Sequence, residues 1–515
     1  MIHTNDPKWF LTGLVLMTPG FLSNLSAQKQ DKPQKKNVLF IAIDDMKPLL
    51  GCYGDPIAQT PNMDRLAAKG TLFTLAYCQQ AVSGPTRASL LTGLRPDHTK
   101  MWDMTERFRT VNPDAVTIPQ YFRQNRYETA GIGKIFDQSQ VSGKTNDVLS
   151  WSIPYMDQTA FYDKNTEPPT GFRGEYQATE IREAMKTNGE KFVQENMFYA
   201  TECVDVSDGA YKNGAITNGV EQFIQNYRSE KPFFLAVGFQ KPHLPFVAPK
   251  KYWDLYKREQ MPLAKFSQKA TASPDFAYTN SGELPQYSDI PAAVEFSDIK
   301  NMVMKDDKAR QLIHGYYACV SYTDAQIGKV IAALEKKKVL NNTIIVLWGD
   351  HGWHLGDHGL WCKHTNFEQA THSPLIIIDP SIKSSIVTTP VEFVDIYPTL
   401  CELAGISKPE KLDGISLVSG MKNPKKLTKK YAVSQYPRDE NKMGYSLRDG
   451  KYRYTVWVEW KNRVSNFDKI IAEELYDYEK DPLETVNQVN AKSYVTIAKT
   501  MKQYVTEYIQ SQKIQ

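Results

Sequence analysis

The sequence predicts an α/β fold in which a mostly parallel β-sheet carries helices on both of its faces. Three observations support this prediction. Continuous apolar runs of strand length recur along the chain, helical patterns lie between them, and each run stops at charged or titratable residues. Alternating strands and helices of this kind form parallel sheets. The 515 residues suffice for one large α/β domain with an appendage, or for two to four units of ordinary size.

The predicted strands are apolar runs of the type that is buried on both faces of a parallel sheet. They cover residues 37–43, 127–133, 232–238 and 343–349. Ligands of such sheets bind beyond the carboxyl ends of the strands. The residues just after these ends therefore form the candidate site, and they are Asp44, Asp45, Lys134, His243, Asp350 and His351.

The predicted helices lie in the connections between these strands. They cover residues 61–69, 116–124, 214–227 and 316–336, and Thr60 is the expected N-cap of the first. A shorter helix is predicted over residues 85–92, because Pro85 suits a first helical turn and Gly93 suits the position after a helix end.

Ser83 stands just before this short helix, where free backbone N–H groups and the helix dipole attract a tetrahedral oxyanion. Arg87, one turn along, adds a permanent positive charge. By itself this pattern is equally typical of an ordinary capped helix.

Three carboxylates are expected to meet at the strand ends, those of Asp44, Asp45 and Asp350. They would repel one another and raise one another's pKa unless a cation neutralised them. We therefore predict a bound divalent metal. The oxygen-rich ligand set favours calcium, although His351 leaves zinc or magnesium open.

The first 27 residues are interpreted as a signal peptide, because Lys8 precedes an apolar stretch that ends in small residues. This stretch is shorter than the ~20 residues of a membrane-spanning helix, which makes an uncleaved anchor the weaker alternative. We expect an exported chain, periplasmic or secreted, that begins near Gln28 and has no membrane span after signal removal.

The 62 basic and 58 acidic residues leave a formal charge of +4. This balance argues against a nucleic-acid partner but leaves room for a local cationic pocket. The six cysteines follow no repeating spacing, so we expect at most an incidental disulfide.

Several stretches resemble the type I sulfatases, which are formylglycine-dependent members of the alkaline phosphatase superfamily. Ser-Gly-Pro-Thr-Arg at residues 83–87 is similar to their (Cys/Ser)-x-(Pro/Ala)-x-Arg signature. The further stretches are TPNMDRLAAKG, QQAVSGPTRASLLTGLRPDHT, KPHLPF, GDHGWHLGDHGLWCKHTNFEQATHSPLI and VEFVDIYPTLCELAGI. Together they look most like iduronate-2-sulfatases and bacterial uronate 2-O-sulfatases, and the resemblance extends from about residue 37 to residue 487.

The resemblance implies a large mixed, mostly parallel sheet flanked by helices in a catalytic domain (residues 28–406). It also implies a smaller C-terminal subdomain (residues 407–515), where the sequence shows patterns of antiparallel strands and a terminal helix over about 493–510.

The resemblance also assigns roles to individual residues. Calcium would be held by Asp44, Asp45, Ser83, Asp350 and His351. Arg87 would steady the formylglycine, while Lys134, His243 and Lys363 would contact the sulfate, with His243 or Lys363 protonating the leaving sugar oxygen.

Formylglycine (3-oxoalanine) would be made from Ser83 by a maturation enzyme. There is a chemical reason for this modification: a serine hydroxyl attacking a sulfate ester would leave a sulfated serine that is as hard to hydrolyse as the substrate. The sequence departs from the family at two places. Residue 83 is serine where cysteine is more familiar, and Asp137 stands where many members have histidine.

The function implied is a calcium-dependent sulfatase acting on a sulfated oligosaccharide, with the 2-O-sulfate of a uronic acid in heparin, heparan sulfate or chondroitin sulfate as the expected target. One alternative is a phosphomonoesterase or phosphonate hydrolase of the same superfamily that uses Ser83 directly. Another is a protein that binds sulfated glycans without turning them over.

Overall fold

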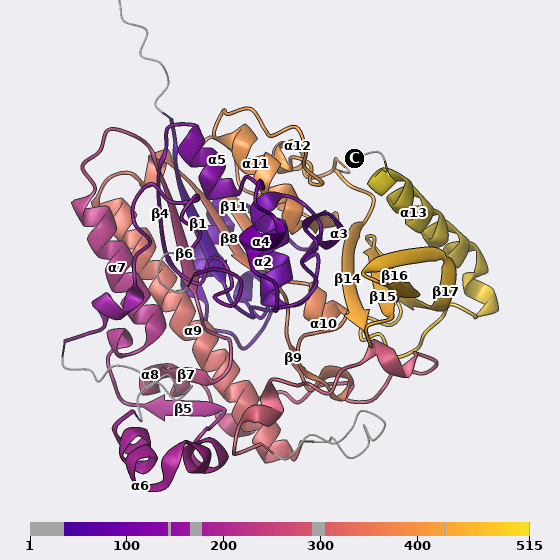
Figure 1. Cartoon of the computed structure of the whole chain (residues 1–515), viewed down its shortest axis with the longest axis horizontal. Coiled ribbons are helices and arrows are strands. Elements are labelled where there is room, and N and C mark those ends of the chain that lie inside the picture. Colours follow the sequence, from indigo (N-terminus) through magenta and orange to yellow (C-terminus); the bar gives the residue numbers. More distant parts are fainter. Residues whose placement is uncertain (1–34, 143–145, 165–177, 291–303, 427, 514–515) are drawn as a thin grey trace, which may run out of the picture. The chain divides into compact units, whose positions relative to one another are not determined.

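The computed structural model describes residues 35–142, 146–164, 178–290, 304–426 and 428–513. The signal peptide predicted at residues 1–27 lies outside these residues. Within them, seven strands form a central sheet in the order β12-β2-β11-β8-β1-β6-β4 (Figure 1). Their bounds are β1 Asn37–Ile43, β2 Thr71–Phe73, β4 Glu128–Gly133, β6 Phe233–Phe239, β8 Thr343–Gly349, β11 Leu375–Ile378 and β12 Ser385–Val387.

The predicted fold class is confirmed. The four predicted strands are β1, β4, β6 and β8, each within one residue of its expected bounds, and all are parallel neighbours. Of the seven described strands of this sheet, only β11 runs antiparallel to its neighbours, β8 and β2, so the sheet is mixed. No sequence pattern had indicated β11.

Helices cover both faces of the sheet, and the alternating side chains of β1 show how. Leu39 and Ile41 belong to the core beneath α1 (Pro61–Lys69), α7 (Lys212–Asn226) and α9 (Asp306–Lys336). Val38 and Phe40 belong to the core beneath α2 (Ser83–Thr92), α5 (Ile118–Gln124) and α11 (Ile396–Leu403). Because both faces are buried, the strand reads as a continuous apolar run.

Two helices begin earlier than predicted. The helix α2 starts at Ser83 itself, because Val82 is extended and already accepts the first helical bond from Thr86 N–H. Pro85, now the third residue of the helix, still costs no helical hydrogen bond, since the first four N–H groups of a helix have no partner within it. The helix α9 starts at Asp306, ten residues before the expected 316, because its first turns are too polar to show a clear period.

The expected cap at Thr60 is correct in position but wrong in chemistry. Thr60 makes no capping hydrogen bond to α1. Its hydroxyl instead accepts from Gly51 N–H at 2.9 Å and lies 3.2 Å from Asp64. The Thr60 side chain is therefore engaged by Gly51 and Asp64 and does not cap α1.

A second, four-stranded antiparallel sheet forms near the C-terminus, as expected for the smaller subdomain. It consists of β14 (Ala432–Arg438), β15 (Lys442–Arg448), β16 (Tyr452–Lys461) and β17 (Val464–Asp477), and α13 (Val495–Lys513) packs on it (Figure 1). The carboxylate of Glu368 joins this sheet to the N-terminal part of the chain, because it pairs with Arg448 and Arg453 and accepts from Tyr77.

The remaining elements are short or peripheral to the site. The strands are β3 (Ala76–Tyr77), β5 (Thr201–Val204), β7 (Phe246–Pro249), β9 (His354–Leu355), β10 (Trp361–Cys362) and β13 (Val391–Glu392). The helices are α3 (Pro96–Thr99), α4 (Phe108–Val111), α6 (Ala178–Asn196), α8 (Lys250–Trp253), α10 (Glu368–Thr371) and α12 (Val418–Lys422).

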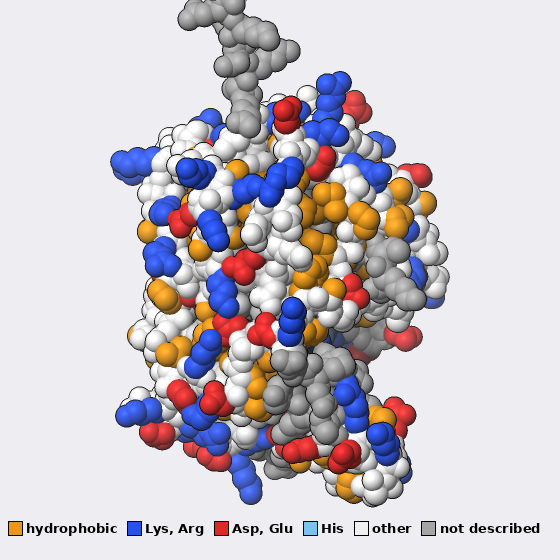
Figure 2. Space-filling view, turned by 90° about the vertical axis from the view of Figure 1, so that its left-hand side faces the viewer, with side chains coloured by type: hydrophobic (Ala, Val, Ile, Leu, Met, Phe, Trp, Pro, Cys, Tyr) orange, Lys and Arg blue, Asp and Glu red, His pale blue; other side chains and the backbone are white. Residues whose placement is uncertain are grey.

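Three sequence expectations concern the chain as a whole. All six cysteines lie in the described part and are free, so the incidental disulfide does not form there. None of the described helices has the length and apolar character needed to cross a membrane. Figure 2 shows Lys and Arg side chains interspersed with acidic and neutral ones on the face that it draws, in keeping with the small net charge.

Gly133 ends β4 and fixes where the next residue, Lys134, leaves the sheet. Its φ of +82° is left-handed, and a Cβ there would lie 2.1 Å from the carbonyl oxygen of Gly238 on β6. Lys134 N–H donates to that same oxygen at 2.8 Å. The close approach of two backbones therefore requires glycine at this position.

We expect Gly133→Ala to lower the free energy of unfolding by roughly 2–5 kcal/mol, because it combines a left-handed φ with a backbone clash. The matched control is Gly54→Ala, which has a φ of +87° but nothing within 4 Å of its added Cβ. The control should cost about 1–2 kcal/mol. Urea denaturation measures both, and equal losses would contradict the clash.

Candidate active site

The carboxyl ends of the central strands meet at one edge of the sheet. Asp44 N–H donates to the carbonyl of Phe239 at the end of β6, and Asp350 N–H donates to Ile43 at the end of β1, both at 3.1 Å. Asp45 has a left-handed φ of 57°, so the backbone leaves the direction of β1 at this residue. Residues that lie about 300 positions apart in the sequence thus become neighbours.

Arg87 is the buried anchor of this site. Its Nη2 lies 3.1 Å from Asp44 Oδ1 and its Nε lies 3.0 Å from Asp350 Oδ2, with both the guanidinium and the carboxylates removed from solvent. Its Nη1 donates to the backbone carbonyls of Lys134 and Ile135. Because every nitrogen is engaged with the protein, Arg87 organises the carboxylates from α2.

Ser83 lies in the first turn of α2 with its hydroxyl directed at this cluster. Its Oγ is 3.0 Å from Asp44 Oδ1, 3.3 Å from Lys134 Nζ and 3.4 Å from His351 Nε2. Asp44 also accepts from Lys134 at 2.7 Å. Burial alone would raise the pKa of Asp44, but the charges of Lys134 and Arg87 outweigh it and hold the pKa well below its usual value.

Asp137, the departure from the family pattern, lies 3.1 Å from Lys134 Nζ. Burial works against its charge, but Lys134 and hydrogen bonds from Ser139 lower the pKa of Asp137 to about 2. An ionised carboxylate with so low a pKa is a weak base. Its contact instead keeps Lys134 charged and in place.

Three residues converge as a group that could hold a metal ion: Asp45, Asp350 and His351, whose ligand atoms all lie within 4.8 Å of one another. His351 Nδ1 lies 2.9 Å from the carbonyl of Gly352, which assigns it as the donor and leaves a lone pair on Nε2. Burial lowers the pKa of His351 to about 4, so the ring is neutral at pH 7.

The electrostatics of this group favour a cation. Burial, reinforced by the carboxylates of Asp44, Glu283 and Asp350, raises the pKa of Asp45 well above its usual value despite the nearby Lys363. The His351 lone pair also faces Asp45 Oδ1 at 3.3 Å. Acceptors that face one another in this way fit a divalent ion, and carboxylate oxygens fit calcium. Asp44 lies beside the group, but its oxygens already accept from Ser83, Arg87 and Lys134.

Lys363 follows β10 and is buried against Asp45. Its Nζ lies 3.1 Å from Asp45 Oδ1, 2.7 Å from Glu283 Oε1 and 4.9 Å from the centre of the Trp353 ring. No strand ending indicated Lys363, which came from the family resemblance alone. Glu283 was missed altogether, because it lies in a short polar turn where neither periodicity nor motif distinguishes it.

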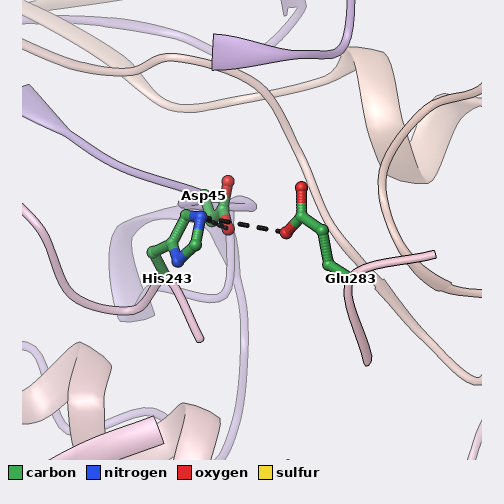
Figure 3. A group of neighbouring side chains, drawn as sticks. All are labelled: Asp45, His243 and Glu283. Atoms are coloured by element: carbon green, nitrogen blue, oxygen red, sulfur yellow. Dashed lines mark ion pairs between the residues drawn. The ribbon is translucent and has the colours of Figure 1, made fainter. Parts of the chain in front are cut away.

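His243 approaches Asp45 from the segment after β6 (Figure 3). Its Nδ1 lies 2.6 Å from the carbonyl of Leu244 and donates to it, so Nε2 is the nitrogen that faces the site. This Nε2 lies 3.7 Å from Asp45 Oδ2 and 3.8 Å from Glu283 Oε2. Burial and the ammonium group of Lys363 lower the pKa of His243 to about 3.

A cavity of about 260 Å³ adjoins these residues, and its lining includes Asp44, Lys134, Asp137, Lys212, Lys241 and His243. The structure thus brings all nine predicted site residues into one connected cluster beside this cavity. Lysines around a hydroxyl can bind a small oxyanion next to a nucleophile. The arrangement suits the transfer of a tetrahedral anionic group.

Known proteins are similar to this chain over nearly all of its length. The family model described as Sulfatase matches residues 36–406, and the model described as N-sulphoglucosamine sulphohydrolase, C-terminal, matches residues 356–511. Iduronate 2-sulfatase of Homo sapiens is 34% identical, covering 93% of this chain and 95% of that protein.

Solved structures share the fold. One is a protein in complex with its substrate D-glucosamine-2-N,6-O-disulfate, with a TM-score of 0.71 and 22% identity over 93% of this chain and 98% of that one. Another is the phosphonate monoester hydrolase of Agrobacterium radiobacter, with a TM-score of 0.69 and 20% identity over 92% and 95%.

We expect Arg87→Met to lower the free energy of unfolding by about 3–5 kcal/mol, because it leaves Asp44 and Asp350 buried without their shared cation. The control is Arg463→Met, which removes an exposed arginine paired with Asp103 and Glu106. That change should cost less than about 1 kcal/mol. Guanidinium denaturation compares them, and a loss at Arg87 no larger than the control would show that the pair is not an anchor.

Proposed function

Since this chain belongs to the sulfatase family, whose members hydrolyse sulfate esters, we propose that its substrate is a sulfated oligosaccharide. The target is the 2-O-sulfate of a uronic acid in glycosaminoglycans of the heparin, heparan or chondroitin type. The identity of 34% to an iduronate 2-sulfatase over almost the full chain supports this choice. The observation that carries the reaction class is the Ser83 hydroxyl, held between Asp44, Lys134 and His351.

Ser83 is the residue that a maturation enzyme converts to formylglycine in this proposal. The modified residue supplies two geminal hydroxyl groups, one to act as nucleophile and one to allow release of the product. The contacts of Ser83 favour this role, because Asp44 accepts a hydrogen bond from a hydroxyl at this position and so orients it, and Lys134 can stabilise negative charge that develops on its oxygen.

Calcium would be held by Asp45, Asp350 and His351, with Asp44 and residue 83 completing the set. When bound, the ion would offset charge on the sulfuryl oxygens and favour ionisation of the nucleophile. Asp350 is prepared for this role, since its Oδ1 accepts from the backbone N–H groups of Asp45 and His351 and is therefore fixed in orientation.

Lys134 and Lys363 would bind the sulfuryl oxygens. Each ammonium group contacts a carboxylate of the cluster, Asp44 or Asp45, and this contact fixes its position. Either Lys363 or His243, whose Nε2 faces the site, would protonate the departing sugar oxygen. An anionic ester beside this nitrogen favours its protonated form and so opposes the effect of burial on its pKa. We assign this chemistry to residues 28–406 and a wall of the pocket to residues 407–515.

Residues 1–27 would direct the chain to the periplasm or the exterior and be cleaved off during export, so that the mature protein acts where glycosaminoglycan fragments are encountered. The second candidate function is hydrolysis of phosphate or phosphonate monoesters by unmodified Ser83. This alternative is retained because a phosphonate monoester hydrolase has the same fold.

The modification is tested by mass spectrometry of protein matured in its own host. We expect the tryptic peptide of residues 70–87 to be lighter by two hydrogen atoms than its sequence requires, and the protein to release sulfate from uronate 2-sulfate disaccharides. Ser83→Ala should abolish this activity, whereas Ser381→Ala, next to Lys36 at the far end of β1, should retain it. An unmodified Ser83 with phosphatase activity would favour the second candidate, and glycan binding without turnover would favour a binding protein.

Metal binding is tested by thermal unfolding after chelation. Calcium at 100 times its dissociation constant should stabilise the protein by about 2.7 kcal/mol, and more than magnesium or zinc at the same concentration. Asp45→Asn should remove this stabilisation, while the exposed Asp103→Asn should keep it. Greater stabilisation by zinc would contradict calcium, and no response to any of the three ions would contradict the metal site.

A further inference from the structure

Glu283 is an acidic side chain at the edge of the site for which the proposed chemistry has no role. Its carboxylate lies 2.7 Å from Lys363 Nζ and 3.4 Å from His364 Nε2. Its side chain is 21% exposed, whereas that of Lys363 is 2% exposed. Glu283 therefore stands between the buried cluster and the solvent from which a substrate arrives.

The position of Glu283 is fixed by the same strand that presents Lys363. Trp361 N–H donates to Ser281 Oγ at 2.9 Å, and Cys362 Sγ lies 3.7 Å from the Ser281 carbonyl. Leu284, the next residue after Glu283, is buried. The residues just before Lys363 thus contact Ser281, and Leu284 is packed in the core. The segment that carries Glu283 is therefore held against β10, and the carboxylate is in place before any ligand binds.

A carboxylate at this place has a cost for a site that binds anions. It partly neutralises Lys363 and repels a sulfate group bound nearby. It also faces His243 Nε2 at 3.8 Å, a distance too long for a direct hydrogen bond, and both atoms are acceptors while His243 is neutral (Figure 3). The carboxylate of Glu283 therefore presents unused acceptor capacity to an incoming group that can donate.

A sugar hydroxyl is such a group. If His243 contacts the ester oxygen, the oxygen on the adjacent ring carbon lies within reach of Glu283, because vicinal oxygens of a pyranose are close together. A free hydroxyl there can donate to Glu283, and carboxylates form strong hydrogen bonds. A second sulfate at that carbon would instead meet a negative charge and no donor.

We propose that Glu283 is a specificity-determining residue that accepts a hydrogen bond from a free hydroxyl on the carbon next to the sulfate ester and excludes a second sulfate at that carbon. The inference rests on the proposed function and names the substrate class more narrowly. The site is selective for esters with an unsubstituted neighbouring hydroxyl.

The test compares kcat/KM for the wild type and Glu283→Gln on four substrates: a uronate 2-sulfate disaccharide with a free 3-hydroxyl, its 3-deoxy analogue, its 3-O-sulfated analogue and 4-nitrophenyl sulfate. The aryl ester has no neighbouring hydroxyl and reports any indirect effect through Lys363. Ratios to the aryl ester therefore isolate recognition of the hydroxyl.

The wild type should prefer the hydroxylated disaccharide over the deoxy analogue by about 10- to 100-fold, the effect of one hydrogen bond to a charged group. Glu283→Gln should reduce this preference at least threefold and raise relative activity on the 3-O-sulfated substrate, since an amide can donate to sulfate. The control is Glu479→Gln, an exposed glutamate that also lies 2.7 Å from a lysine, Lys451, and it should keep all four values.

Two results would overturn the inference while leaving the proposed function standing. One is a wild type that does not distinguish the hydroxylated from the deoxy substrate. The other is a Glu283→Gln enzyme that loses the same factor on all four substrates, which would make Glu283 a positioning residue for Lys363. A wild type that carries formylglycine but hydrolyses no sulfate ester would overturn the proposed function and this inference with it.

Discussion

The site depends on one buried arrangement, the guanidinium of Arg87 between the carboxylates of Asp44 and Asp350. These carboxylates follow two adjacent strands and would otherwise repel each other in a medium that screens poorly. The same guanidinium binds the carbonyl of Lys134 after β4. Because Arg87 lies one turn after Ser83 on α2, the arrangement also fixes the Ser83 hydroxyl relative to three strand ends.

The division of charge follows from this anchor. Asp44 is satisfied by Arg87 and Lys134, so it remains ionised beside Ser83. Asp45 has Lys363 but also faces the His351 lone pair, and its pKa is raised. Negative charge thus remains uncompensated around Asp45, where a cation can bind, while Lys134 lines the cavity. In the proposed reaction, Lys134 would attract the anionic ester from the cavity and Asp44 would orient the hydroxyl of Ser83.

Much of this could be predicted from residues alone, and the limits have physical causes. Apolar runs predicted β1, β4, β6 and β8, because a strand that is buried on both faces has apolar side chains at nearly every position. The residues just after these strands included most of the site. Lys363 could not be found in this way, since it reaches Asp45 from a loop whose course is set by tertiary contacts. Glu283 depends on a turn tied to β10 by Ser281, a contact between segments 80 residues apart that no local signal records.

The buried pairing of Glu368 with Arg448 and Arg453 limits how such chains can diversify. Burial would raise the pKa of Glu368, but the two arginines lower it to about 2. Arg453 also donates to the carbonyl of Asn366, three residues after Lys363. If the β14–β17 sheet were exchanged for one without these arginines, the buried carboxylate of Glu368 would lose its partner charges. The loop that carries Lys363 would also lose its contact with Arg453. The antiparallel sheet and the segment that carries Lys363 therefore form one structural unit, which an exchange of whole modules would disrupt and a change of residues at the rim would leave intact.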